Sequence, residues 1–217
     1  MNKQTFLTLL ATFVLLFSFT FSCSAKGKDK AKHVVFIGLD GWGAYSLPKA
    51  DMPNVKKLME DGSYTLKKRS ALPSSSAINW ASMFMGAGPE LHGYTEWGSK
   101  TPELPSRVLN KNGIFPTVFQ LLRDARPEAE IGCLYEWEGI KYLVDTLSLS
   151  YHYHVADCNK TPKELGNMAS SYIKEKHPAL VAICYDGPDH TGHTAGHDTP
   201  AVSYTHLRAH ETVLDLV

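Results

Sequence analysis

The sequence has no excess of charge of either sign, because 22 Lys and Arg residues balance 22 Asp and Glu residues among its 217 residues. Proteins that bind nucleic acid through its phosphate backbone carry a surplus of positive charge. We therefore expect no nucleic-acid-binding surface. A small anionic substrate remains compatible with this composition, because bound metal ions can supply positive charge locally.

Cysteine is also scarce. Of four cysteines, three lie beyond the N-terminal segment, namely Cys133, Cys158 and Cys184. An odd number without C-x-x-C spacing argues against a disulfide framework and against a cysteine-based zinc site. We predict that each of the three is a small buried hydrophobic residue.

The N-terminal segment has the pattern of an export signal. Lys3 precedes an apolar stretch over residues 6–21, and small residues follow it up to Ala25. We predict a signal peptide over residues 1–25, a charged spacer over 26–32, and a location in the periplasm or cell envelope. Two processing routes remain open. Cleavage after Ala25 would release the protein, whereas lipidation of Cys23 would anchor it to the membrane.

Residues 33–201 alternate between strand and helix patterns, and 43% hydrophobic composition suffices for one core. The alternation predicts an α/β fold with a mostly parallel central sheet flanked by helices. A long loop is expected over 86–113. The predicted strands are 33–40 and 179–184, whose continuous apolar runs predict that both are buried, together with 63–72, 130–134 and 151–156. The predicted helices are 52–61, 78–85, 115–125, 138–144 and 161–176.

Metal-ligand side chains are concentrated after the last predicted strand. The stretch 186–198 begins with a turn over 185–188 and contains three His and three Asp within thirteen residues. Carboxylate and imidazole together suit zinc and other first-row metals. Asp189 and His193 are four residues apart, so one helical turn would bring both to the same ion. A polar loop with solvated histidines is the alternative, and the density of ligands favours a metal site.

Two further stretches are ambiguous. Three serines, up to Ser76, precede the apolar helix predicted from residue 78. They would satisfy the free N–H groups at the helix start, or Ser76 would be a nucleophile activated by a metal. His92, in a Gly-rich turn, is either part of a site or a structural hydrogen-bonding residue. Asp40 stands at the carboxyl end of the first strand, where reactive groups lie in α/β sheets.

Taken together, these stretches resemble the alkaline phosphatase superfamily, and most closely its type I phosphodiesterase / nucleotide pyrophosphatase family. The matching motifs are Asp40-Gly41, Met52-Pro-Asn-Val-x-x-Leu with Gly62, Pro73-Ser-Ser-Ser76-Ala-Ile-Asn79, Gly86-x-x-Pro89-Glu-x-His92-Gly93 and Tyr185-x-x-Pro188-Asp189-x-x-Gly192-His193.

The resemblance implies a hydrolase of small phosphate esters with two divalent metal ions, usually zinc. By position, Asp40 and Ser76 would bind one metal, and Asp189 and His193 the other. Ser76 would be the nucleophile, and Asn79 would orient the turn that carries it.

The sequence departs from the family pattern in two places. Tyr94 follows His92-Gly93 where the nucleotide phosphodiesterases usually place an Asn, so the phosphate donor is unidentified. A later Asp-His pair and a final His are missing, and residues 202–217, with His206 and His210, resemble an unrelated tail. We therefore expect a fold incomplete at its C-terminus, with an unpaired sheet edge and two ligands per metal. Such a fragment of an active parent would be inactive or barely active.

Two alternative functions remain. A phosphomonoesterase or a sulfatase-like hydrolase would share the fold, although the Cys-x-Pro-Ser-Arg motif of sulfatases is missing around Ser76. A non-catalytic envelope binding protein of the same fold would use Ser76 only as a helix cap.

Overall fold

The computed structural model describes residues 31–156 and 162–203. The chain divides into two compact units, Met1–Lys32 and His33–Val217, and the sheet with its helices belongs to the second. The predicted export signal, Cys158 and Thr161 lie outside the described residues. Of the predicted tail only Val202 and Ser203 are described, and Val202 is completely buried.

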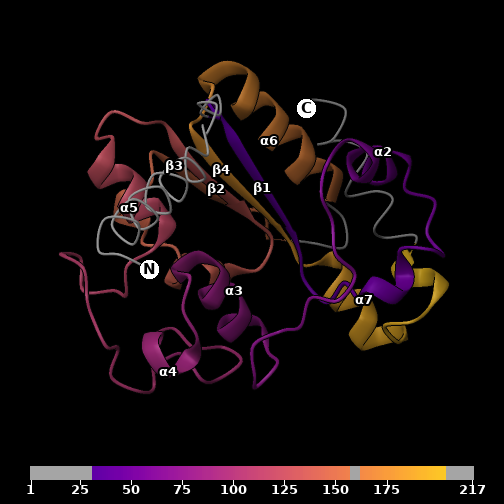
Figure 1. Cartoon of the computed structure of the whole chain (residues 1–217), viewed down its shortest axis with the longest axis horizontal. Helices are drawn as coiled ribbons and strands as arrows, with labels where there is room; N and C mark the ends of the chain where they lie inside the picture. Colours follow the sequence, from indigo (N-terminus) through magenta and orange to yellow (C-terminus); the bar gives the residue numbers. More distant parts are fainter. Residues whose placement is uncertain (1–30, 157–161, 204–217) are drawn as a thin grey trace, which may run out of the picture. The chain divides into compact units, whose positions relative to one another are not determined.

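A four-stranded parallel sheet forms the centre of the second unit, in the order β1-β4-β2-β3 (Figure 1). Its strands are β1 (Val34–Leu39), β2 (Ile131–Tyr135), β3 (Tyr151–His154) and β4 (Leu180–Tyr185). β2 and β4 are buried along their whole length, because each has a strand on both sides. The predicted α/β fold with a parallel sheet is confirmed.

Helices cover both faces of the sheet (Figure 1). One face packs against α3 and α5 through a large apolar core that includes Trp80, Phe84 and Phe119. The other face packs against α6 through a second core around Leu165 and Ile183. The α-helices are α2 (Pro53–Asp61), α3 (Ser76–Met85), α4 (Pro89–His92), α5 (Val118–Ala125), α6 (Pro162–Lys176) and α7 (Gly187–Ala195). The 3-10 helices are η1 (Ala44–Ser46), η2 (Glu138–Tyr142) and η3 (Thr146–Ser148).

The first strand differs from the prediction in its burial. The apolar run over 33–40 predicts a buried strand, but among the described residues β1 pairs with β4 alone and forms an edge of the sheet. Val34 is accordingly 48% exposed, and the other residues of the strand are only partly buried. An apolar run indicates a strand, but it does not show whether that strand pairs with one other strand or with two.

Other predicted elements need correction. The strand expected over 63–72 is not formed, and its residues are exposed apart from a half-buried Ala71. Three successive cations, Lys67 to Arg69, interrupt the short alternation of Tyr64 and Leu66, and both of these apolar residues stay exposed. The loop expected over 86–113 contains the short helix α4. The helix expected from residue 115 begins at Val118, after the N-cap Thr117, whose hydroxyl accepts a hydrogen bond from Gln120 N.

Cys133 and Cys184 are free and buried in the core beneath α3, as predicted. Within the described ranges, none of the helices combines the length and apolar character that crossing a membrane would require.

Candidate functional site

Three carboxylates follow the ends of three neighbouring strands. The register pairs Leu39 with Tyr185, and Asp40 N donates to Tyr185 O at 2.9 Å, so Asp40 and Asp186 leave the sheet side by side. On the other side of β4, Glu136 N donates to Cys184 O. The carboxyl edge of the sheet therefore brings Asp40, Glu136 and Asp186 together, as expected for the reactive edge of a parallel sheet.

Asp40 is held in place by two donors. Gly41 N donates to Oδ1 at 2.9 Å, and the indole Nε1 of Trp80, on α3, donates to Oδ2 at 3.0 Å. The Trp80 ring lies directly over Gly38, where any side chain would overlap it. The glycine in β1 thus allows α3 to pack close enough to orient the Asp40 carboxylate.

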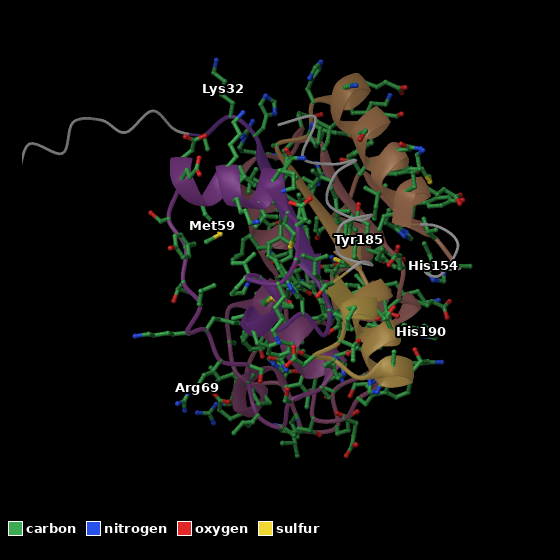
Figure 2. All side chains as sticks on the ribbon, turned by 90° about the vertical axis from the view of Figure 1, so that its right-hand side faces the viewer. Lys32, Met59, Arg69, His154, Tyr185 and His190 are labelled. Atoms are coloured by element: carbon green, nitrogen blue, oxygen red, sulfur yellow. The ribbon has the colours of Figure 1, made fainter. Side chains whose placement is uncertain are left out.

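Helix α7 begins directly after β4, where the sequence suggested a turn. Figure 2 shows Tyr185 at the end of β4 close to this helix, which carries His190. Glu136 caps the helix, because its Oε2 accepts from Asp186 N at 2.7 Å and from Gly187 N at 3.1 Å. Burial raises the pKa of Glu136 to about 7, an effect that the two N–H groups partly offset.

The helical turn predicted for Asp189 and His193 is present. Their carboxylate and imidazole lie on one face of α7, with Asp189 Oδ2 3.3 Å from His193 Nε2. Gly41 adopts a φ of +65°, and a Cβ at this position would lie 2.6 Å from the Cα of Asp189. Glycine is therefore required where the loop after β1 approaches the helix.

Ser76 is the first residue of α3, two residues before the predicted start. The N-cap is Ser75, whose side chain makes no capping hydrogen bond and whose Oγ is buried without a partner. Asn79 holds the preceding turn, since its Oδ1 accepts from Ala71 N at 2.7 Å and its Nδ2 donates to Ser75 O at 3.0 Å. The serines therefore do not act as a conventional side-chain cap, and Asn79 constrains the turn that presents Ser76.

All four predicted metal-site residues line one cavity of about 740 Å³, and Asn79 lines it as well. They come from the loop directly after β1, from α3 and from α7, which are far apart in the sequence. The residues are Asp40, Ser76, Asp189 and His193.

The donor groups form two clusters that share Asp189. In one, ligand atoms of Asp189, His193 and His197 lie within 4.8 Å of one another, and in the other those of Asp40, Asp186 and Asp189 do so. Burial, followed by the charges of Asp40 and Asp189, raises the pKa of Asp186 to about 6, and burial with Asp40 raises that of Asp189. Carboxylates that repel one another in this way fit a site that holds divalent cations.

Sequence reasoning assigned two ligands to each metal and missed two donors. Asp186 and His197 belong to the ligand-rich stretch but received no role, because their directions depend on where α7 begins and ends. Glu136 and Trp80 were also missed. A carboxylate directly after the buried strand β2 is the one signal that could have indicated Glu136.

The Gly-rich turn has a structural role in the fold. His92 is completely buried, with Nε2 3.1 Å from Ser82 Oγ and Nδ1 accepting from Tyr94 N at 3.1 Å. Tyr94, which stands where the family usually has an Asn, points its hydroxyl to Tyr142 O at 3.1 Å. The loop that follows reaches the site, since Trp97 O accepts from Ala77 N and the side chain lines the cavity beside Ser76.

Comparisons with known proteins agree with this architecture. Murine ectonucleotide pyrophosphatase/phosphodiesterase 5, an inactive form in complex with AMP, superimposes with a TM-score of 0.64 and 16% identity over 86% of this chain and 51% of its own. Phosphonoacetate hydrolase from Sinorhizobium meliloti, in complex with phosphonoformate, superimposes with a TM-score of 0.63 and 17% identity, over 85% of this chain and 52% of its own. A protein of the alkaline phosphatase superfamily from Vibrio parahaemolyticus superimposes with a TM-score of 0.59 and 14% identity, over 87% of this chain and 50% of its own.

The chain therefore spans about half the length of these structures. A comparison with curated protein sequences gives no significant match. The model of one family, type I phosphodiesterase / nucleotide pyrophosphatase, matches residues 34–217. The chain belongs to the type I phosphodiesterase / nucleotide pyrophosphatase family.

Proposed function

We propose that this protein hydrolyses phosphate esters, with Ser76 as the nucleophile and two divalent metal ions, zinc in the first instance, bound at the carboxyl edge of the sheet. The observation that carries the proposal is the convergence of Asp40, Ser76, Asp189 and His193 on one cavity. Family membership supports the reaction class. Two of the similar structures hold AMP and phosphonoformate, which supports a small phosphorus-containing substrate.

The two donor clusters fit the metal ions by their chemistry. Asp189, His193 and His197 supply one carboxylate and two imidazoles, and Asp40, Asp186 and Asp189 supply carboxylates only. When bound, two cations would neutralise the phosphate oxygens and lower the pKa of a serine hydroxyl. The resemblance also assigns Ser76 to the metal of Asp40.

The residues of the chain then act on the substrate in order. Ser76 Oγ attacks phosphorus in line, the Ser76 O–P bond forms, and the bond from phosphorus to the leaving oxygen breaks. Ser76 Oγ gives up its proton to solvent during the attack, and the leaving oxygen takes one proton from solvent, so the leaving group departs as an alcohol. Water then attacks the phosphoserine, which releases the phosphate product and regenerates Ser76. Throughout, Asn79 holds the turn before α3 and so limits the movement of the attacking oxygen.

Hydrolysis of bis-p-nitrophenyl phosphate by the zinc-loaded chain tests the proposal. Because the chain spans about half the length of its structural neighbours, we expect slow turnover compared with a complete hydrolase. The Ser76→Ala variant should lose this activity, and mass spectrometry of the quenched wild type should find a p-nitrophenyl phosphoryl group on Ser76. Retained activity in Ser76→Ala would contradict the nucleophile.

The neighbouring serine provides the matched control. Ser75→Ala also removes one hydroxyl at the start of α3, from a residue whose Oγ has no partner, so its fold should be unchanged. We expect it to keep most of the activity.

Comparison with p-nitrophenyl phosphate then distinguishes diester from monoester preference. Export and the lipid anchor at Cys23 remain predictions from residues 1–25.

A further inference from the structure

The turn that follows α7 brings a third donor to Asp189 and His193. The imidazole rings of His193 and His197 are 5.5 Å apart between centroids and inclined by 72°. Each offers a nitrogen within 4.8 Å of the other and of an Asp189 oxygen. The His193 side chain is 71% exposed and the Asp189 side chain 21% exposed, so the cluster opens toward solvent on one side.

The backbone of this segment is shaped around the His197 ring. A Cβ on Gly192 would overlap the His197 imidazole, so only glycine leaves the space that the ring occupies against α7. Gly196 then turns the chain back with a φ of +90°, and its N–H donates to Gly192 O at 2.8 Å. Val202, a few residues on, is completely buried and anchors the segment beyond the turn.

We propose that Asp189, His193 and His197 form a zinc site contained in nine consecutive residues, with His197 as the third ligand. One carboxylate and two imidazoles are a donor set that zinc takes with three protein ligands and an open fourth position. Because all three donors come from α7 and its following turn, the site needs no ligand from another segment. The proposal deepens the proposed function, since Asp189 and His193 are shared, but it concerns zinc binding alone.

Zinc affinity of the whole 217-residue chain, measured by competition with a chromophoric zinc chelator, tests the site. Loss of an outer-shell partner costs roughly 10–100-fold in metal affinity, so His197→Gln, which removes a direct ligand, should lose at least about that factor. Gly192→Ala should also weaken zinc binding although it removes no ligand, because its methyl group displaces the His197 ring.

Two measurements separate loss of a ligand from loss of the fold. Metal-free Gly192→Ala should unfold at the same or a higher temperature than the wild type, because alanine has the higher helix propensity. His152→Gln, which removes an exposed imidazole on β3 at the far side of the sheet from β1, should bind zinc as the wild type does.

Equal zinc affinity in His197→Gln and the wild type would overturn the proposal. Hydrolysis is not the readout. If the wild type shows no turnover but His197→Gln still lowers the zinc affinity, the result supports the zinc site and contradicts only the proposed function. A chain that hydrolyses esters, yet binds zinc equally well with and without His197, contradicts the site only.

Discussion

The imidazole of His92 is completely buried, and both of its ring nitrogens are engaged. Since Tyr94 N donates to Nδ1, that nitrogen carries no proton, and Nε2–H is left to donate to Ser82 Oγ. Burial lowers the pKa of His92 from 6.5, and the charge of Glu90 opposes the shift only in part. His92 is therefore a neutral imidazole whose two hydrogen bonds join α3 to the loop after α4.

This burial predicts a pH dependence of stability. Below its ordinary pKa of 6.5 the unfolded chain protonates His92 while the folded chain does not, so the free energy of unfolding falls as the pH decreases through that value. Above it, His92 contributes no pH dependence. Denaturant unfolding between about pH 5 and pH 8 should show this loss in the wild type and less of it in His92→Gln. The site carboxylates are common to both proteins, and parallel pH profiles would contradict the assignment.

At the scale of elements, α7 is the one that connects the sheet to the candidate ligands. It starts at Gly187, and its first N–H groups point at the buried carboxylate of Glu136. An acceptor at this place satisfies two donors that water would otherwise have to reach. It also holds the first turn of the helix against β2, which determines where Asp189 and His193 project.

Removing this acceptor should destabilise the fold. Glu136→Ala leaves the buried N–H of Gly187 and the partly buried N–H of Asp186 without a partner, at a cost of about 1–3 kcal/mol for a buried orphaned group. For a domain of this size, 1 kcal/mol lowers the Tm by about 2–4 °C. Thermal unfolding of the metal-free protein measures the effect.

Glu136→Gln is the control for that measurement, because it keeps one oxygen that can accept from both N–H groups. It should lose less stability than Glu136→Ala. Equal melting temperatures for the two variants and the wild type would show that the cap contributes nothing.

Over the whole molecule, the candidate ligands lie on segments that follow different strands of the sheet. Asp40 follows the edge strand β1, and Asp186 and Asp189 belong to the segment after β4. A cation between them would link the loop after β1 to α7, and it would offset the burial and the repulsion by Asp40 and Asp189 that together raise the pKa of Asp186 to about 6. Metal binding and stability should therefore be coupled.

Chelation tests this coupling. A ligand present at 100 times its Kd stabilises the folded state by about 2.7 kcal/mol. Removal of zinc by a chelator should therefore lower the Tm by about 5–10 °C for a domain of this size. His193→Gln, which removes one ligand, should show a smaller difference with and without zinc. A Tm that does not respond to zinc in the wild type would contradict binding to the folded chain.

The sequence by itself determined the parallel α/β fold, the strand that directly precedes Asp40, and the helical spacing of Asp189 and His193. These depend on local patterns, such as apolar runs and four-residue spacing, which act over a few residues. It overestimated the burial of β1 and predicted a strand over residues 63–72, because pairing is decided by neighbours that a local pattern does not contain.

Only the tertiary structure decided which side chains complete the site. The strand register places Glu136 beside Asp186, and the packing of Trp80 over Gly38 orients Asp40. The missing side chain at Gly192 leaves room for the His197 ring against α7. Each of these depends on contact between surfaces that meet only after folding, so spacing along the chain could not reveal them.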